Sequence, residues 1–359
     1  MSYEMREAKE RVIRAGKELV EAGLIARTWG NISARISDTQ FVITPSGRAY
    51  DTLTPDQIVT VGIQDLAWSG DVKPSSEKGV HAAAYALRPD VNFVIHTHQN
   101  YATALSTLAR PLAVGQIEEE AGDVLGPEVP VAAYGLSSTK TLTDHVRDCI
   151  RRYPASRAVL LRNHGTLCMG RDDGDASHVA HVLEQVSKKR YLELACGKAP
   201  EDTEPDYEIR KHWRVFRREI HEEYDAFCEI FDNPSVSCVI TSDAPYIRQY
   251  SAFGRALPPY VDDLTQIVGV HIPCLPYDAG RKKLKAALRE TCSAVLVKGR
   301  GAVCCAGSEE DAEAVMMLVD KVCQVALLER AGCRPRTVPL AGGLLEHVVY
   351  VKKYSKLKN

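Results

Sequence analysis

The sequence predicts an α/β fold of mixed strands and helices, and part of this fold is expected to occur twice along the chain. Apolar residues recur every three or four positions from Met5 to Leu19, which is the spacing of an amphipathic helix. Short runs rich in Val, Ile and Phe, such as 40–50, end in turn residues and indicate strands. A segment near residue 94 returns near residue 239, which indicates duplication.

The elements follow from the same two patterns, in chain order. Gly23 is placed to end the opening helix. A later helix is expected from Glu77 to Leu87, with Ser75 or Ser76 as its N-cap. The other expected elements are a strand over 40–50 that runs into a Pro-Ser-Gly turn, strands over 58–63 and 92–98, a strand over 156–165 that ends in Asn-His-Gly, and a helix from about 175 to 195.

The repeat is visible without gaps. VIHTHQNYATALSTLARPL (94–112) lies over VITSDAPYIRQYSAFGRAL (239–257), and three later segments also match in the same order. We interpret this as a second copy that keeps the scaffold but lacks the opening helix and first strands. In this copy Thr241 and Asp243 replace two histidines, and Arg300 replaces His164.

This repeat sets the expected domains. The first domain spans 1–200, and the polar, acidic stretch 201–235 has the composition of a linker. The truncated copy spans 236–345, and it is followed by a basic tail over 346–359.

Composition restricts the partners. The 359 residues are 45% apolar and 26% charged, and the formal net charge of −2 gives no electrostatic reason to expect nucleic acid or a membrane surface. No stretch has about 18 uninterrupted apolar residues, and the N-terminus is charged, so we expect a cytoplasmic protein that acts on a small molecule. The 11 cysteines lack a CxxC pattern and are expected to be reduced and mostly buried.

His96 and His98 stand one residue apart on an apolar strand, so they should share one face of it. A metal bound by neutral imidazoles needs about three ligands from separate elements, with one position open. His164, in the turn Asn-His-Gly, is the natural third ligand, and Glu77 heads a helix just upstream. Alone, an HxH pair is more often structural than catalytic, so the prediction depends on the combination.

The motifs GNISAR, ITPSG, SSE, HTHQNYATALS and NHG occur in this order, and together they resemble the class II aldolase and adducin family over residues 1 to about 200. The resemblance implies a mixed, largely antiparallel central sheet flanked by helices in three layers. Within that family are L-fuculose-1-phosphate aldolase, L-ribulose-5-phosphate 4-epimerase and the cytoskeletal adducins, which lack the metal site.

The resemblance also implies roles for particular residues. His96, His98 and His164 would hold zinc or another divalent ion such as Mn, Fe, Co or Ni, and Glu77 would be the catalytic acid or base at the enediolate carbon. The phosphate pocket of the family would map onto Thr28, Gly30, Asn31, Ser46, Gly47, Ser75 and Ser76. Each residue also has a structural interpretation: glycines permit turns, Asn31 and Ser75 cap, and Glu77 complements a helix dipole.

The function implied is a lyase: an aldolase that cleaves a phosphorylated ketose to dihydroxyacetone phosphate and an aldehyde through a metal-stabilised enediolate. A sugar-phosphate 4-epimerase would use the same site for retro-aldol cleavage and recombination. A third interpretation is a non-catalytic, adducin-like interaction protein, against which the intact histidines argue.

Two departures from the family pattern concern the loop after the HxH helix. Gln116 stands where fuculose-phosphate aldolases carry a tyrosine from a neighbouring subunit, which argues against fuculose phosphate as the substrate. Asp123 is a candidate for the aspartate of the epimerases. Four other histidines, His81, His145, His178 and His181, are expected to be solvated or satisfied helix residues.

Family members are usually cyclic tetramers, so the second copy would imitate a neighbouring subunit. We therefore expect a homo-oligomer, either a homodimer with pseudo-fourfold symmetry or a homotetramer. The alternative is that the extra domain only packs against the first or covers an outer surface.

Overall fold

The chain folds into two compact units, Met1–Tyr191 and Leu192–Asn359, in a computed structural model. The structure describes residues 3–115, 119–195, 197, 209–220, 227–288 and 293–353. Within these residues no helix combines the length and the apolar character that a membrane span requires.

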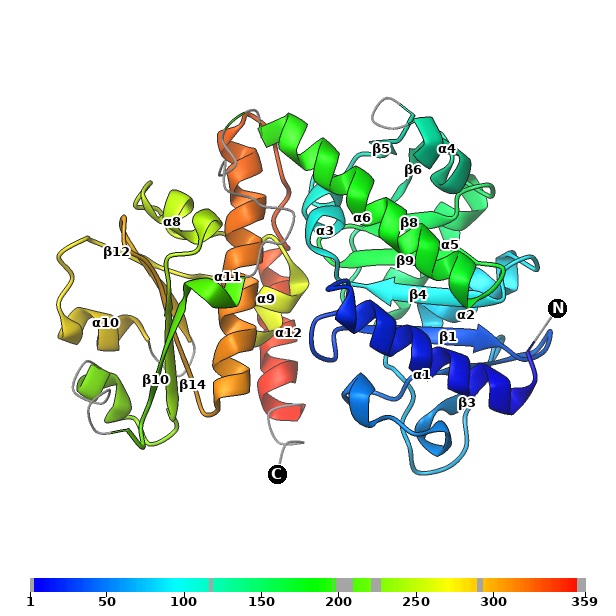
Figure 1. Cartoon of the computed structure of the whole chain (residues 1–359), viewed down its shortest axis with the longest axis horizontal. Coiled ribbons are helices and arrows are strands. Elements are labelled where there is room, and N and C mark those ends of the chain that lie inside the picture. Colours follow the sequence, from blue (N-terminus) through cyan, green and yellow to red (C-terminus); the bar gives the residue numbers. More distant parts are fainter. Residues whose placement is uncertain are drawn as a thin grey trace. The chain divides into compact units, whose positions relative to one another are not determined.

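The first unit is built on a seven-stranded sheet (Figure 1). All neighbouring strands are antiparallel except the last pair, which is parallel. In spatial order the strands are β3 (Val59–Gly62), β2 (Gln40–Ile43), β1 (Gly30–Arg35), β4 (Phe93–Thr97), β9 (Gly165–Gly170), β8 (Ala158–Leu161) and β7 (Val131–Ala132). The predicted mixed, largely antiparallel sheet is confirmed.

Helices cover both faces of this sheet, and α1 and α6 cross in front of it in Figure 1. On the other face α2 and α5 pack together over a core that contains Phe41, Val94 and Leu167. The helices are α1 (Met5–Glu21), α2 (Lys78–Leu87), α3 (Asn100–Ser106), α4 (Glu119–Leu125), α5 (Lys140–Arg152) and α6 (Asp173–Ala195), with short 3-10 turns η1 (Tyr50–Thr52) and η2 (Pro55–Gln57) and a separate hairpin of β5 (Leu112–Ala113) and β6 (Glu128–Val129).

The predicted opening helix is confirmed, because α1 ends at Glu21 and Gly23 follows with a positive φ of 71°. The predicted cap of α2 is wrong by one or two residues. The N-cap is Glu77, and the Oγ atom of Ser75 accepts a hydrogen bond from the backbone N–H of Glu77 at 3.2 Å. The serine therefore shapes the turn that precedes the helix and does not cap it.

The second unit repeats the first unit's sheet in a smaller form. Its strand order is β10 (Trp213–Arg217), β11 (Cys238–Ser242), β14 (Gly301–Ala306), β13 (Ala294–Val297) and β12 (Cys274–Leu275). This order corresponds to β1, β4, β9, β8 and β7, and the last pair is again parallel. Helices α3 and α8 (Pro245–Ser251) differ by the same 145 positions as the sequence repeat.

The turn between the last two antiparallel strands is also repeated. Asn163 and Gly299 occupy it with φ values of 62° and 66°. Two residues after this position stands a glycine, Gly165 in the first unit and Gly301 in the second. At each of these glycines a Cβ would lie within 2.3 Å of a backbone carbonyl oxygen. The duplication is therefore confirmed by backbone geometry as well as by sequence.

Three details of the predicted organisation need correction. The segment 201–235 is not only a linker, because β10 within it pairs with β11 and stands in the place of β1. The second copy thus retains a counterpart of one early strand. The predicted basic tail begins inside α12 (Leu340–Lys353), where the buried Glu346 accepts a hydrogen bond from Thr265 at 2.9 Å. Residues 354–359 lie outside the described part.

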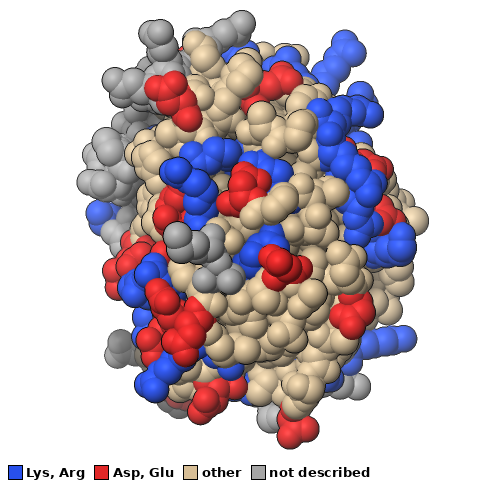
Figure 2. Space-filling model, turned by 90° about the vertical axis from the view of Figure 1, so that its right-hand side faces the viewer, with Lys and Arg blue, Asp and Glu red and all other residues tan. Residues whose placement is uncertain are grey.

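The remaining described elements of the second unit are η3 (Ile209–His212), α9 (Asp262–Ile267), α10 (Arg281–Ala287) and α11 (Glu309–Arg330). A separate apolar core holds this unit together and includes Phe231, Val239, Val295 and Val303. Nine cysteines lie in the described residues; all nine are reduced thiols and six of them are buried, as predicted. On the face drawn in Figure 2, positive and negative side chains are interspersed, as the balance of 45 basic and 47 acidic residues suggests.

Candidate metal centre

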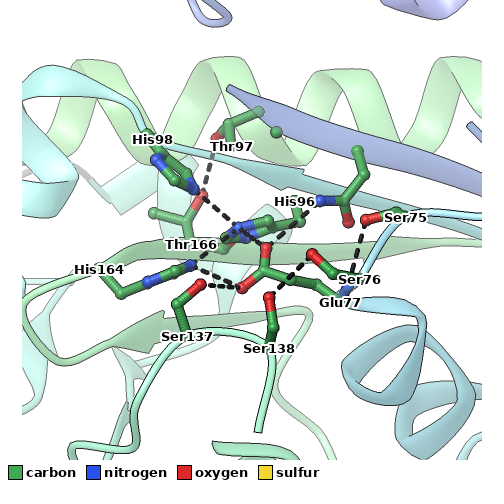
Figure 3. Close-up of polar contacts among 12 residues, drawn as sticks. Ser75, Ser76, Glu77, His96, Thr97, His98, Ser137, Ser138, His164 and Thr166 are labelled. Atoms are coloured by element: carbon green, nitrogen blue, oxygen red, sulfur yellow. Dashed lines mark hydrogen bonds and ion pairs between the residues drawn. The ribbon is translucent and has the colours of Figure 1, made fainter. Parts of the chain in front are cut away.

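Four side chains from three segments converge at one end of the first sheet (Figure 3). They are Glu77, His96, His98 and His164, and their potential ligand atoms all lie within 4.8 Å of one another. Within the described residues, this is the group of His, Cys, Asp and Glu side chains arranged to hold a metal ion. The predicted convergence of the three histidines is therefore confirmed.

His96 lies in β4 on the same face as Val94, which belongs to the core beneath α2. His98 follows the end of β4 and is half-buried, so it is not a strand residue as predicted. Its Nε2 atom nevertheless lies 2.9 Å from Nε2 of His96, because the chain turns towards α3 at this point. His164 comes from the turn before β9, and its Nε2 atom is 3.2 Å from Nε2 of His96.

The backbone fixes the orientation of the His96 ring. Its Nδ1 atom lies 2.7 Å from the carbonyl oxygen of Thr166, and a carbonyl only accepts, so Nδ1 carries the proton. The lone pair of Nε2 then faces the other imidazoles. This is the arrangement in which metal-binding histidines are held by a second hydrogen bond.

Glu77 faces the histidines from the start of α2. Its carboxylate oxygens lie 2.9 Å from Nε2 of His96 and 3.1 Å from Nε2 of His164. Burial raises the pKa of Glu77, but the imidazoles of His164 and His96 lower it by more, and the net pKa lies well below its ordinary value. The carboxylate form therefore predominates at neutral pH.

This donor set suits a divalent cation. Three imidazoles with a neighbouring carboxylate are typical ligands of zinc and also fit Mn, Fe, Co or Ni. With the proton of His96 on Nδ1, Nε2 of His96 and the carboxylate oxygen Oε2 of Glu77 are two acceptors only 2.9 Å apart. A cation between them would remove this repulsion, and the cluster can therefore hold a metal ion.

A glycine makes this close approach possible. A Cβ at Gly165 would lie 2.3 Å from the carbonyl oxygen of Thr97, 3.1 Å from the ring of His98 and 3.3 Å from the ring of His96. Since a backbone carbonyl cannot move away easily, any side chain here would push β4 and its histidines from β9.

We therefore expect Gly165→Ala to reduce the free energy of unfolding by about 1–3 kcal/mol and to weaken metal binding. Urea denaturation and metal titration would measure both effects. Gly174→Ala is the matched control, because a Cβ at Gly174 meets only a side-chain oxygen at 3.5 Å and the residue lies in α6. Equal behaviour of the two variants would contradict the steric argument.

The residues expected to bind phosphate lie on three adjoining segments. Gly30 and Asn31 pair with Thr97 and His96 across β1 and β4. The backbone N–H of Ser46 bonds to the carbonyl of Lys73, which brings the Ser46–Gly47 turn beside the segment that leads to Ser75 and Ser76. Thr28 lies in the loop just before β1. The structure thus brings these segments together, and their role in binding phosphate stays a prediction.

Gly30 also has a structural task. Its φ is 120°, and a Cβ there would lie 2.6 Å from the carbonyl oxygen of His96. The structural interpretation of this glycine is therefore sufficient by itself to explain why no side chain stands there.

Two serines at the site were missed by the sequence analysis. The hydroxyl of Ser137 donates to Oε1 of Glu77 at 3.2 Å, and the hydroxyl of Ser138 donates to that of Ser76 at 2.8 Å. A signal was present, since this Ser-Ser pair precedes α5 much as Ser75 and Ser76 precede α2. Of the two residues singled out in the loop, Gln116 lies outside the described residues and Asp123 is exposed on α4.

His81 was expected to be a satisfied helix residue, and the structure places it fully inside the core. Its Nδ1 atom lies 2.6 Å from Oγ of Ser33 and its Nε2 atom 2.5 Å from Oδ1 of Asn31. Burial is the main cause that lowers the pKa of His81 to about 3; the electrostatic interaction with His96 lowers this pKa further, and the interaction with Glu77 opposes the shift.

This shift predicts acid sensitivity. Between pH 6.5 and pH 3 the unfolded chain binds a proton at His81 and the folded chain does not, so the free energy of unfolding falls as the pH falls. We expect a loss of about 2 kcal/mol from this residue between pH 7 and pH 5. Urea denaturation of metal-free wild type and His81→Gln would show it as a smaller pH dependence in the variant. Identical pH dependence would contradict a neutral buried His81.

The two sheets and the histidine cluster define a duplicated α/β protein whose first copy carries a group of side chains that can hold a metal ion. The chain belongs to the Class II Aldolase and Adducin N-terminal domain family, whose sequence pattern matches residues 10–191 and again 197–327.

Several proteins with known names are similar to this chain. The chain is 30% identical to L-ribulose-5-phosphate 4-epimerase UlaF of Salmonella paratyphi C (strain RKS4594) over 218 residues, which is 58% of this chain and 94% of that protein. A solved L-fuculose 1-phosphate aldolase is 30% identical, with a TM-score of 0.49 over 63% of this chain and 96% of that chain. The aldolase of that name from Thermus thermophilus is 27% identical, with a TM-score of 0.44 over 51% and 94%.

The second copy holds no such centre in its described part. Thr241 lies in β11, Asp243 is exposed just after it, and the guanidinium of Arg300 lies 4.2 Å from the centre of the Tyr277 ring. These are the three positions that correspond to His96, His98 and His164. The predicted loss of the metal ligands is therefore confirmed: these three residues do not belong to the group of described residues that can hold a metal ion.

Proposed function

We propose that the protein is a divalent-metal-dependent aldolase that cleaves a phosphorylated ketose to dihydroxyacetone phosphate and an aldehyde. The observation that carries the proposal is the cluster of Glu77, His96, His98 and His164 within 4.8 Å, in a chain of the class II aldolase family. A binding module has no need of such a cluster, which weighs against an adducin-like interaction protein.

A divalent ion held by the three histidines would act as a Lewis acid towards the carbonyl and hydroxyl oxygens of the ketose. The chain itself supplies the proton transfer. Glu77 is ionised and lies beside the imidazoles, so it can take a proton from the substrate or return one to the enediolate carbon. Ser137 donates to the oxygen Oε1 and so restricts the rotation of the carboxylate.

The phosphate would lie among Gly30, Asn31, Ser46, Gly47, Ser75 and Ser76, with Thr28 at the edge. Backbone N–H groups, small hydroxyls and the start of α2 favour a dianion without a lysine or arginine. The buried amide of Asn31 reaches Glu77 at 3.3 Å, so the pocket would adjoin the acid–base group.

A second candidate is a sugar-phosphate 4-epimerase. It is favoured by the 30% identity to the ribulose-phosphate epimerase, which extends over 94% of that protein. Such an enzyme would use the same site for retro-aldol cleavage and would recombine the fragments with the opposite stereochemistry. The two candidates differ in whether free aldehyde accumulates.

The deciding experiment incubates the metal-loaded protein with a panel of ketose phosphates and identifies the products. An aldolase releases dihydroxyacetone phosphate and an aldehyde in equal amounts, whereas an epimerase yields only a stereoisomer of the substrate. Elemental analysis of the purified protein should find about one divalent ion per chain. Absence of bound metal and of turnover would contradict both candidates.

We also propose that the protein is a homodimer with pseudo-fourfold symmetry or a homotetramer, in which the second copy stands for a neighbouring subunit. The repeated strand order of the second unit supports this idea. Measurement of the mass in solution would test it, and a stable monomer of 39.6 kDa would contradict it.

A further inference from the structure

A row of five buried polar side chains leads from the core to the metal centre. It begins at Tyr85, passes through Ser33, His81 and Asn31, and ends at Glu77. The distances between neighbouring polar atoms are 2.8, 2.6, 2.5 and 3.3 Å. No member is more than 7% exposed. Buried polar groups of this kind are costly unless each is paired, and here each link is paired.

The placement of the Asn31 amide allows only one order of protons along the row. Its nitrogen donates to Oε2 of Glu77 at 3.3 Å, and its oxygen lies 2.5 Å from Nε2 of His81. His81 therefore carries its proton on Nε2, and its Nδ1 atom accepts from Ser33. The oxygen of Ser33 is then free to accept from the hydroxyl of Tyr85.

We propose that His81 is a positioning residue that determines which end of the Asn31 amide faces the reaction site. By donating from Nε2 to the amide oxygen, it directs the NH2 group towards Glu77. This group has two N–H bonds, so one can hold the carboxylate while the other serves an anionic oxygen of the substrate. The proposal deepens the proposed function and rests on it for the substrate.

Loss of the donor at His81 would allow the amide to turn over. The oxygen of Asn31 would then face the carboxylate of Glu77, and two acceptors would repel each other and the phosphate. The metal ligands would keep their own contacts, because His96 is held by Thr166 and His81 touches none of the three histidines by hydrogen bond among the described residues.

Three substitutions distinguish the effect of the hydrogen-bond donor at Nε2 of His81 from the effect of the space that the ring fills. His81→Gln can place an amide nitrogen near the position of Nε2, His81→Asn can do so only near Nδ1, and His81→Leu fills the space without a polar group. We expect kcat/KM on the accepted ketose phosphate to fall about 10- to 100-fold in the Asn and Leu variants and to stay within about threefold in the Gln variant. Metal content should stay at the wild-type level in all three.

A purely structural histidine would give another result. The Asn and Gln variants would then lose activity in proportion to their loss of stability, which urea denaturation measures in parallel. Equal loss in both, or full activity in His81→Leu, would overturn the proposal.

The protonation state of the His81 ring can be measured independently of enzymatic activity. Nitrogen NMR of the wild type with 15N-labelled histidine should show a neutral His81 ring with its proton on Nε2 at pH 7, assigned by the signal that a His81 variant lacks. A proton on Nδ1, or a charged ring, would overturn the proposal. If the wild type turns over no ketose phosphate but this signal is found, the proposed function fails and the orientation of Asn31 by His81 stands.

Discussion

Replacing His96 by alanine is expected to remove the bound metal and to reduce turnover at least about 1000-fold. His96 is fully buried at the middle of the cluster, and its Nε2 atom lies within 3.2 Å of Nε2 of both other histidines. The loss of one of three imidazoles leaves a two-histidine site, which binds divalent ions weakly. A metal ion that stabilises developing charge lowers the activation barrier by several kcal/mol, so its loss accounts for the expected 1000-fold decrease in turnover.

The test combines elemental analysis with the turnover assay after equal metal loading. His178→Ala is the matched control, because His178 is exposed on α6 in the same unit. It should keep both metal and activity. The site is misplaced if His96→Ala keeps a full equivalent of metal, or if His178→Ala loses it.

Glu77→Gln is expected to keep the metal and to reduce kcat by about 100- to 10,000-fold. The amide matches the carboxylate in shape but cannot take up or deliver the proton, and general acid–base catalysis usually contributes a factor of this size. The three imidazoles remain, so the metal should stay. Burial and the contacts to Asn31 and Ser137 make the side chain well ordered, which limits other effects of the change.

The comparison variant is Glu10→Gln, at an exposed glutamate of α1 that pairs with Arg6. Its kcat should equal that of the wild type. Two results for Glu77→Gln would contradict the acid–base role of Glu77. A kcat above one tenth of the wild-type value would show that another group moves the proton. Loss of the metal would show that the main role of Glu77 is to bind the metal ion.

Much of the fold was predictable because its signals are local. The spacing of apolar residues gave α1, and the turn residues around 45–47 gave the end of β2. The gapless repeat predicted a second sheet, and the shift of 145 residues reappears between α3 and α8. The strand β10, Trp-Arg-Val-Phe-Arg, was missed because it lies in a polar, acidic stretch and is only five residues long, and its pairing partner β11 begins 21 residues after β10 ends.

The sequence indicated which histidines belong to the cluster, but not how they come together in space. An HxH pair and an Asn-His-Gly turn name the residues, but His96 and His164 stand 68 positions apart and meet only because β4 pairs with β9. Gly165, which follows His164, is the one sign of that contact in the nearby sequence, since the missing side chain leaves room for the rings of His96 and His98.

By itself the sequence determined the α/β class, the duplication and the residue types of the histidine cluster, since each can be recognised from short sequence patterns. Only the tertiary structure decided which polar groups share the core with them. In the sequence His81 resembles any helix histidine, and its hydrogen-bond partner Asn31 lies 50 positions away, where α2 meets β1. Hydrogen-bond partners of this kind are selected by burial, because a polar group removed from water must find whatever partner the fold brings near.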